Sequence, residues 1–199
     1  MFIPNIDDYN IILASQSPRR HYLLKEIGLE FEIKLKNFID ESYPEHLQKE
    51  EIPLYIAKKK SNAFGTLQDL EILITADTIV WLKNKVLQKP EDHEDAIRIL
   101  KELSGKCHQV YTGVCIKSRQ KEVLFSACTD VYFKKLTYAE IDYYINNFQP
   151  FDKAGAYGIQ EWIGYIGVEK INGSFFNVMG LPIQKLYTEL DDFINGKID

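Results

Sequence analysis

The sequence predicts one α/β domain built on a mixed β-sheet, and three observations support this prediction. Runs of apolar, β-branched residues typical of buried strands alternate with segments of helical periodicity. Hydrophobic residues make up 45% of the 199 residues, and 12 Tyr and 11 Phe supply a sizeable core. No internal repeat, low-complexity tract or linker interrupts the chain, so residues 1–199 are expected to fold as a single domain.

The first expected element is a buried strand that runs almost directly into a helix. Residues 11–14 are all apolar, as in a strand that is covered on both faces. The helix is expected over residues 18–27. Ser17 is a good N-cap, Pro18 suits the first helical position, and Gly28 supplies a left-handed end.

The later elements alternate between strands and helices. Strands are expected at residues 31–35, 71–82, 86–87, 108–116 and 122–133. Helices are expected from residue 50 onward, at 92–103, from a capping box at 137–140 to residue 148, and at 182–195. The buried helical faces are predicted to hold Ala96, Ile99, Leu100, Leu103, Ile141, Tyr144, Ile145, Phe148, Leu186, Leu190 and Phe193. A hairpin is predicted from strands at 166–171 and 174–178 around an Asn172-Gly173 turn.

Composition excludes several classes of protein. A net charge of −5 argues against broad, non-specific nucleic-acid binding. Cys107, Cys115 and Cys128 are an odd number with no CxxC pair, so neither a disulfide framework nor a zinc knuckle is indicated. No apolar run approaches the ~20 residues that span a bilayer, and the N-terminus does not resemble a signal peptide. We therefore expect a cytoplasmic protein that has no membrane or nucleic-acid partner.

Two arginines stand where folding alone would favour acids. Arg19 and Arg20 lie in the first turn of the first expected helix, where the helix dipole disfavours cations. Free backbone N–H groups at such a terminus attract anions, and the hydroxyls of Ser15 and Ser17 add further donors. One interpretation is a site for a polyanion such as a phosphate chain. The alternative is that both arginines are solvated surface residues.

A second anomaly is Asp77, which interrupts the strongest strand pattern of the chain, residues 72–80. A buried carboxylate must be hydrogen-bonded, paired or bound to a cation, because its desolvation is otherwise costly. Nothing in this run suggests a turn, which favours a functional role. The alternative is an Asp that caps a turn at a strand end or faces solvent at a bulge.

Further charged residues are candidates for the same kind of site. Asp40 and Glu41 end an irregular segment, either as a solvated loop or as metal ligands at a strand end. In the run Lys58-Lys59-Lys60, Lys60 lies on the shoulder of the buried helical face and is the best placed to point into a cleft.

The glycine-rich segment 152–160 is not explained by helix or strand propensity. Its small residues permit close approach of the backbone to a ligand or to another strand. His93, His108, Trp81 and Trp162 form no ligand spacing and are interpreted as surface or packing residues.

These segments occur together in an order that closely resembles the Maf family of nucleoside triphosphate pyrophosphatases. The matching segments are residues 13–20, 40–42, 57–60, 76–78, 89–90, 103–105 with His108, 153–160, 171–174 and 180–182. The resemblance implies an elongated, twisted mixed sheet with flanking helices and two lobes around a cleft, as in the inosine triphosphatases. It also implies cleavage of a nucleoside triphosphate between the α and β phosphates, with a divalent cation (Mg, Mn or Co). A homodimer is allowed but not required.

The resemblance also assigns roles to residues. The implied catalytic residues are Asp77 as proton acceptor, with Lys89, Glu41 and Lys60 lining the cleft. Ser15, Ser17 and Arg20 match the phosphate-binding motif. Glu41 and Asp77 are the expected metal ligands, because Mg²⁺ and Mn²⁺ prefer oxygen.

Three positions resemble the branch of the family that prefers dTTP and UTP. They are Arg19, Thr78 and Gln160, where the branch that resembles 7-methyl-GTP pyrophosphatases typically has Trp, Gln and a nearby Glu. The Gln160 amide offers a donor and an acceptor to the imide edge of a pyrimidine. Two departures flank the motifs: Gln88 replaces a usual Gly, and Glu161-Trp162 stands where smaller residues are common.

The leading hypothesis is therefore an enzyme that cleaves dTTP and UTP, including modified pyrimidine nucleotides, to the monophosphate and pyrophosphate. One alternative is a nucleotide-binding regulator of cell division and septum formation in which hydrolysis is incidental. Another is the same chemistry on 7-methyl-GTP.

Overall fold

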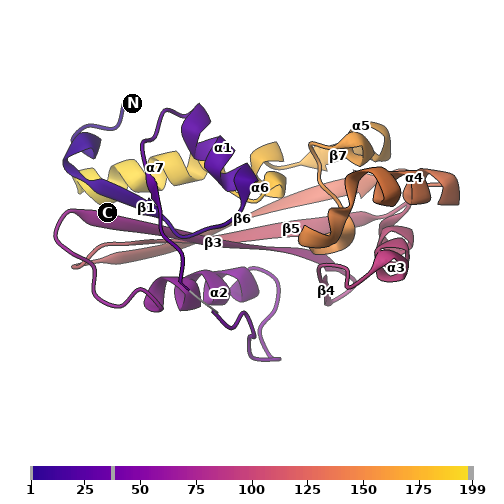
Figure 1. The fold of residues 1–199 in the computed structure, drawn as a ribbon, viewed down its shortest axis with the longest axis horizontal. Helices are drawn as coiled ribbons and strands as arrows, with labels where there is room; N and C mark the ends of the chain where they lie inside the picture. Colours follow the sequence, from indigo (N-terminus) through magenta and orange to yellow (C-terminus); the bar gives the residue numbers. More distant parts are fainter. Residues whose placement is uncertain (1, 37–38, 197–199) are drawn as a thin grey trace. The chain divides into compact units, whose positions relative to one another are not determined.

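The computed structural model describes residues 2–36 and 39–196, and they form a mixed sheet with flanking helices (Figure 1). Seven strands hydrogen-bond in the order β2-β1-β3-β5-β6-β7, with β4 beside β3. The strands are β1 Asn10–Leu13, β2 Glu32–Ile33, β3 Glu71–Leu82, β4 Lys85–Leu87, β5 Cys107–Lys117, β6 Glu122–Phe133 and β7 Val168–Asn172. The α-helices are α1 Pro18–Glu26, α2 Glu51–Asn62, α3 His93–Leu103, α4 Tyr138–Phe148, α5 Trp162–Gly167, α6 Phe175–Met179 and α7 Ile183–Asn195. The predicted α/β class with a mixed sheet is confirmed.

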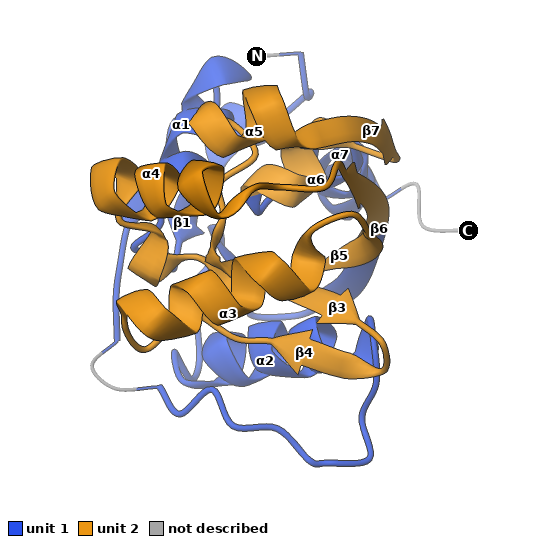
Figure 2. Ribbon diagram, turned by 90° about the vertical axis from the view of Figure 1, so that its right-hand side faces the viewer, with its two compact units in different colours: residues 1–77, 112–127, 180–199 blue, residues 78–111, 128–179 orange. Residues whose placement is uncertain are grey.

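The chain divides into two compact units (Figure 2). The first unit consists of residues 1–77, 112–127 and 180–199, and the second of residues 78–111 and 128–179. The strands β3, β5 and β6 contribute residues to both. The single domain and the cleft between two lobes stay predictions.

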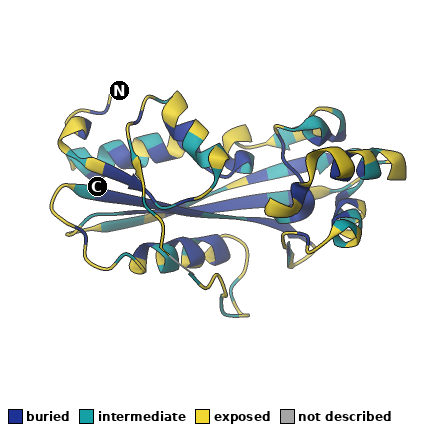
Figure 3. Cartoon of the chain, viewed as in Figure 1, coloured by how far each residue is buried: buried dark blue, intermediate teal, exposed yellow. Residues whose placement is uncertain are grey.

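The first unit is organised around buried parallel strands. In β1, Ile11 and Leu13 stand opposite Ile72 and Ile74 of β3, and all four side chains are buried. Most of β1 and β3 has the colour of buried residues (Figure 3). Helix α2 packs close to this sheet, as shown by the 2.7 Å hydrogen bond that the Thr75 hydroxyl donates to the Ala57 carbonyl. This contact places the polar end of α2 against the middle of β3, where Asp77 lies.

The second unit confirms most of the local sequence signals. Lys83 and Asn84 both have positive φ in the turn between β3 and β4, which is the geometry of a tight hairpin. The Thr137–Glu140 capping box of α4 is present in full. The predicted buried residues of α3 and α4, and those of α7 in the first unit, are buried with one exception, Phe148. Phe148 is 37% exposed because α4 ends at this residue, and its ring stacks on Tyr144 while leaving a face to solvent.

The predicted hairpin around Asn172-Gly173 is wrong. Only β7 is a strand, pairing with β6, whereas residues 162–167 and 175–179 form the short helices α5 and α6. Ser174 explains the start of α6, because its hydroxyl accepts a hydrogen bond from the Asn177 N–H, as an N-cap does.

Asn177 then anchors α6 in the second unit. Its side-chain amide is fully buried and donates to the Val110 carbonyl and the Thr129 hydroxyl, each at 3.0 Å. A buried amide needs such partners, and long-range contacts of this kind leave no signal in the local pattern. The aromatic and apolar residues of this segment therefore misled the prediction of a strand.

None of the helices within residues 2–36 and 39–196 has the length and apolar character that crossing a membrane requires.

The sequence predicted His108 to be a surface or packing residue, and the structure shows a packing residue. It is buried in β5, its ring meets Phe133 and Tyr157 edge-on, and its Nε2 lies 2.7 Å from the Tyr157 hydroxyl. Burial lowers the pKa of His108 from 6.5 to about 3. Its charged form is therefore disfavoured in the folded state.

This burial makes stability dependent on pH. Between about pH 3 and 6.5 the unfolded chain binds a proton at His108 that the folded chain does not. The free energy of unfolding should therefore fall with decreasing pH, by up to about 1.4 kcal/mol per pH unit from this group. Urea unfolding from pH 7 to pH 4.5 measures this slope. His108→Gln should be less stable at pH 7 but show a shallower slope, and equal slopes would contradict the prediction.

Candidate active site

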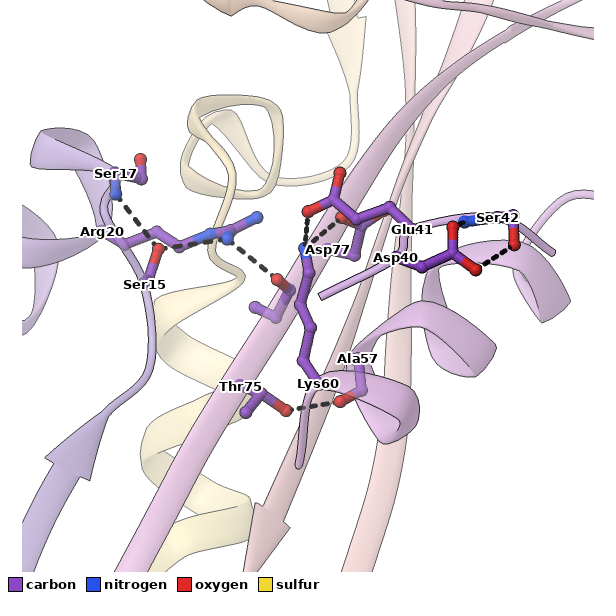
Figure 4. Close-up of polar contacts among 11 residues, drawn as sticks. Ser15, Ser17, Arg20, Asp40, Glu41, Ser42, Ala57, Lys60, Thr75 and Asp77 are labelled. Carbon is purple, nitrogen blue, oxygen red and sulfur yellow. Dashed lines mark hydrogen bonds and ion pairs between the residues drawn. The ribbon is translucent and has the colours of Figure 1, made fainter. Parts of the chain in front are cut away.

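The predicted phosphate-binding segment joins β1 to α1, and Arg20 fastens it to two other parts of the first unit. The Arg20 Nε donates to the Gly180 carbonyl at 2.8 Å, and Nη1 donates to the Ala76 carbonyl at 2.9 Å. Nη1 also lies 3.3 Å from the Ser15 hydroxyl (Figure 4). The alternative of a solvated surface arginine is therefore wrong for Arg20. Arg19 beside it is half-buried.

The loop that contains Ser15 and Ser17 has its own hydrogen bonds, and the phosphate-binding role of both serines stays a prediction. Ser17 holds the N-cap position, but its side chain makes no capping hydrogen bond. Instead the Ser15 hydroxyl accepts from the Ser17 N–H at 3.2 Å, and His21 Nε2 lies 2.7 Å from the Ser15 carbonyl oxygen. The loop between β1 and α1 is thus shaped by its own side chains.

Asp77, Lys60 and Glu41 form a cluster of charges. The Lys60 Nζ lies 2.8 Å from Asp77 Oδ1 and 2.8 Å from Glu41 Oε1 (Figure 4). The Lys60 and Asp77 side chains are each 13% exposed, whereas that of Glu41 is 51% exposed. Asp77 stands within β3 and not at its end, so the turn-capping alternative is wrong.

The environment of Asp77 changes its proton affinity. Burial raises the pKa of Asp77 above its ordinary value, and Glu41 adds to this increase. Lys60 and Arg20 act in the opposite direction through their positive charges. Burial lowers the pKa of Arg20, whereas the negative charge of Asp77 raises it. A carboxyl with an elevated pKa is better suited to accept a proton near neutral pH than an exposed one.

Within the lysine run, Lys60 is the residue directed to the buried carboxylate of Asp77. Lys58 pairs with Glu122 and Lys59 with Asp40, each at 2.9 Å. Asp40 also accepts from the backbone N–H and the hydroxyl of Ser42, and with Lys59 these bonds hold the pKa of Asp40 well below its usual range. The adjacent acids Asp40 and Glu41 therefore have different partners.

The donor set fits a divalent cation that arrives with a phosphate ligand. Among residues 2–36 and 39–196, three or more His, Cys, Asp or Glu side chains are nowhere grouped as a metal site. Glu41 and Asp77 nevertheless direct two carboxylates at one point, the Lys60 ammonium. One or two carboxylates completed by substrate phosphates are the usual ligands of Mg²⁺ in such enzymes.

The first unit thus brings together Ser15, Arg20, Glu41, Lys60 and Asp77 of the predicted site. Ser17 and Arg19 lie in the same unit, whereas Thr78, Lys89 and Gln160 lie in the second. Thr78 follows Asp77 directly and is half-buried, and Lys89 and Gln160 are exposed. Their membership of one site with Asp77 stays a prediction.

The glycine-rich segment of the second unit approaches a neighbouring strand. Gly155 has a φ of +71°, and its N–H donates to the Gln88 carbonyl at 3.2 Å. A Cβ at Gly155 would lie 2.9 Å from a methyl group of Val80 in β3. The small residues were predicted to allow close approach to a ligand or to another strand, and the structure shows the approach to a strand.

Sequence reasoning missed the backbone acceptors of Arg20. The carbonyls of Ala76 and Gly180 lie far from Arg20 in the sequence, and a carbonyl carries no residue-specific signal. The only indication in the sequence is indirect, because both residues belong to segments that match the family motifs.

The fold resembles that of known Ham1 proteins. A Ham1 protein from Coxiella burnetii aligns with a TM-score of 0.52 at 12% identity, covering 92% of this chain and 99% of that one. The Staphylococcus aureus Ham1 protein aligns with a TM-score of 0.50 at 13% identity, covering 94% and 99%. At these identities the likeness shows the fold alone.

Sequence similarity identifies the family. Residues 10–193 match the model of the family described as Maf-like protein, and the chain belongs to this family. A Bacteroides fragilis relative is 55% identical, covering 94% of this chain and 98% of its own. Relatives from Parabacteroides distasonis and Cytophaga hutchinsonii are 55% and 48% identical, covering 96% and 100% of this chain and 100% and 91% of their own. All three are named dTTP/UTP pyrophosphatase, and these names favour neither alternative function.

Proposed function

We propose that this protein hydrolyses dTTP and UTP to the nucleoside monophosphate and pyrophosphate. The observation that supports the proposal is the charge cluster of the first unit. There a buried Asp77 shares the Lys60 ammonium with Glu41, in a chain about half identical to relatives named for this activity. Cytoplasmic location and a free nucleotide substrate belong to the same proposal.

Asp77 accepts the proton of the attacking water. Water attacks the α-phosphorus, the bond from that phosphorus to the bridging oxygen breaks, and pyrophosphate leaves with the bridging oxygen. The elevated pKa of Asp77 makes it a stronger base than an ordinary carboxylate. Lys60, 2.8 Å away, favours the ionised form and stabilises negative charge in the transition state.

The phosphates are bound by the segment between β1 and α1. Ser15, Ser17 and Arg20 supply hydroxyl and guanidinium donors there, and Lys89 supplies a further positive charge. Arg20 is held by the Ala76 and Gly180 carbonyls, so its orientation is fixed before substrate binds. Fixed donors lose little entropy when they bind an anion.

Glu41 and Asp77 would hold a divalent cation, Mg²⁺, Mn²⁺ or Co²⁺. When bound, this ion neutralises charge on the triphosphate. Arg19, Thr78 and Gln160 select the base, with Gln160 hydrogen-bonding the imide edge of thymine or uracil.

A side-by-side substrate profile tests the proposal. Purified protein is given dTTP, UTP, dCTP, dATP, dGTP and 7-methyl-GTP, each with Mg²⁺, Mn²⁺ or Co²⁺, and pyrophosphate release is measured. We expect dTTP and UTP to be cleaved at least about tenfold faster than the other nucleotides, because one or two contacts to the base provide discrimination of this size. A preference for 7-methyl-GTP, or no cleavage of any nucleotide, would contradict the proposal. An Asp77→Asn preparation controls for contaminating activity.

A further inference from the structure

Glu161 follows the proposed base-selecting residue Gln160, and its carboxylate is the centre of a polar network in the second unit. Lys153, whose side chain is 9% exposed, places its Nζ 3.1 Å from Glu161 Oε1 and 2.6 Å from Asp152 Oδ1. The Tyr144 hydroxyl donates to Glu161 Oε2. Glu161 therefore joins the glycine-rich segment to helix α4.

Tyr144 extends the network to the backbone before Gln160. Its side chain is fully buried, and its hydroxyl accepts a 3.0 Å hydrogen bond from the Gly158 N–H. Burial and the neighbouring Glu161 raise the pKa of Tyr144, so it stays a hydroxyl that can donate to Glu161 while accepting from Gly158.

The chain is closely packed at Gly158, beside the Glu161 carboxylate, and at Gly164, where the Ile159 backbone leaves no room for a side chain. A Cβ at Gly158 would lie 2.7 Å from the Glu161 carboxyl carbon, and a Cβ at Gly164 would lie 1.8 Å from the Ile159 carbonyl oxygen. The turn itself is closed by hydrogen bonds from Glu161 N–H to Gly158 O and from Gly164 N–H to Glu161 O, at 3.0 and 2.8 Å. The backbone on both sides of Gln160 is thus closely packed.

Gln160 is exposed although the five residues before it are buried. In residues 155–160 the Gln160 amide therefore extends outward from a backbone that is held in place by Glu161, Lys153 and Tyr144. This matters for base selection, because a glutamine amide carries a donor and an acceptor and can present either to a ligand. A glutamine on a mobile backbone would accommodate the edge of cytosine as readily as that of thymine or uracil.

We propose that Glu161, held by Lys153 and Tyr144, is the positioning residue that makes Gln160 selective for a pyrimidine with an imide edge. This inference rests on the proposed function. Glu161 itself does not contact the base. It restricts the position of the backbone from which the Gln160 side chain extends. Loss of the Glu161 carboxylate leaves Gln160 present but misplaced.

The test compares kcat and KM for dTTP and dCTP in four variants. Glu161→Ala is expected to raise KM for dTTP about tenfold with kcat within about twofold, because a binding contact remote from the reacting phosphorus is lost. Its ratio of kcat/KM for dTTP over dCTP should fall to that of Gln160→Ala. The double variant Gln160→Ala/Glu161→Ala should show no further fall, because both changes remove the same contact. Glu169→Ala, an exposed acid on β7, serves as the matched control with an unchanged ratio.

Tyr144→Phe and Lys153→Arg keep the test decisive if Glu161→Ala does not fold. Tyr144→Phe keeps the ring but loses the hydroxyl that joins Glu161 to the Gly158 N–H, so the dTTP/dCTP ratio should fall. Lys153→Arg keeps the positive charge beside Glu161, so the ratio should be retained. The inference is overturned if Glu161→Ala or Tyr144→Phe keeps the wild-type ratio of kcat/KM for dTTP over dCTP. It is also overturned if the fall of this ratio in the double variant equals the product of the falls in the two single variants.

Amide hydrogen exchange separates this inference from the proposed function. Exchange of residues 154–160 should be about tenfold faster in Tyr144→Phe than in the wild type, since the Gly158 N–H loses its acceptor. Unchanged exchange overturns the inference even if the wild type cleaves dTTP. Faster exchange in a protein that cleaves no nucleotide contradicts only the proposed function.

Discussion

Asp77→Asn lowers kcat for dTTP by about a hundredfold or more, the size of effect that loss of a general base produces. The amide is nearly isosteric with the carboxyl but cannot accept the proton of the attacking water. Lys60 keeps Glu41 as a partner in the variant, so no ammonium is left unpaired in the cluster. Pyrophosphate release at saturating dTTP measures kcat, and the thermal unfolding midpoint verifies that the variant folds.

Asp40→Asn is the matched control for this variant. Asp40 is also an aspartate near the cluster, but it is exposed and bonded to Lys59 and Ser42. We expect its kcat within about twofold of the wild type, the range of an ordinary surface substitution. Asp77→Asn with more than a tenth of the wild-type kcat would contradict the role of Asp77 as the base.

The fold could be predicted where each element carries its own signal. Helix α3 has an Asp92 N-cap and a four-residue buried face, and the ends of β3 were predicted to the residue. The α6 segment carries only the Ser174 N-cap as a local signal. Its aromatic and apolar residues are also typical of a strand, and the helix is anchored by Asn177 bonds to Val110 and Thr129, which are far away in the sequence. Local patterns fail where a long-range contact decides the structure.

The candidate site followed the same rule. Asp77 and Lys60 could be singled out because a charge in an apolar run, or beside a buried helical face, needs a partner. Their pairing with each other, and that of Lys59 with Asp40, depends on how α2 lies against β3 and could not be read from spacing. The backbone acceptors of Arg20 were unpredictable for the same reason.

Lys60→Met shifts the acid limb of the pH profile of kcat/KM to higher pH. Burial has the largest effect on the pKa of Asp77 and raises it, and the charge and hydrogen bond of Lys60 are the largest opposing effects. Without Lys60 the pKa of Asp77 rises further. Asp77 must be ionised to accept a proton, so a higher pH is needed for the same activity. We expect a shift of about one pH unit or more, the range for loss of a close opposite charge.

Lys59→Met is the control, because Lys59 belongs to the same run but pairs with Asp40. Its acid limb should coincide with that of the wild type. The direction of the shift also separates two roles of Lys60. If Lys60 acted only on substrate charge, Lys60→Met would lose the same factor at every pH. If Lys60 keeps Asp77 ionised, part of the lost activity returns as the pH rises. Glu41→Gln should move the limb in the opposite direction, because Glu41 raises the pKa of Asp77.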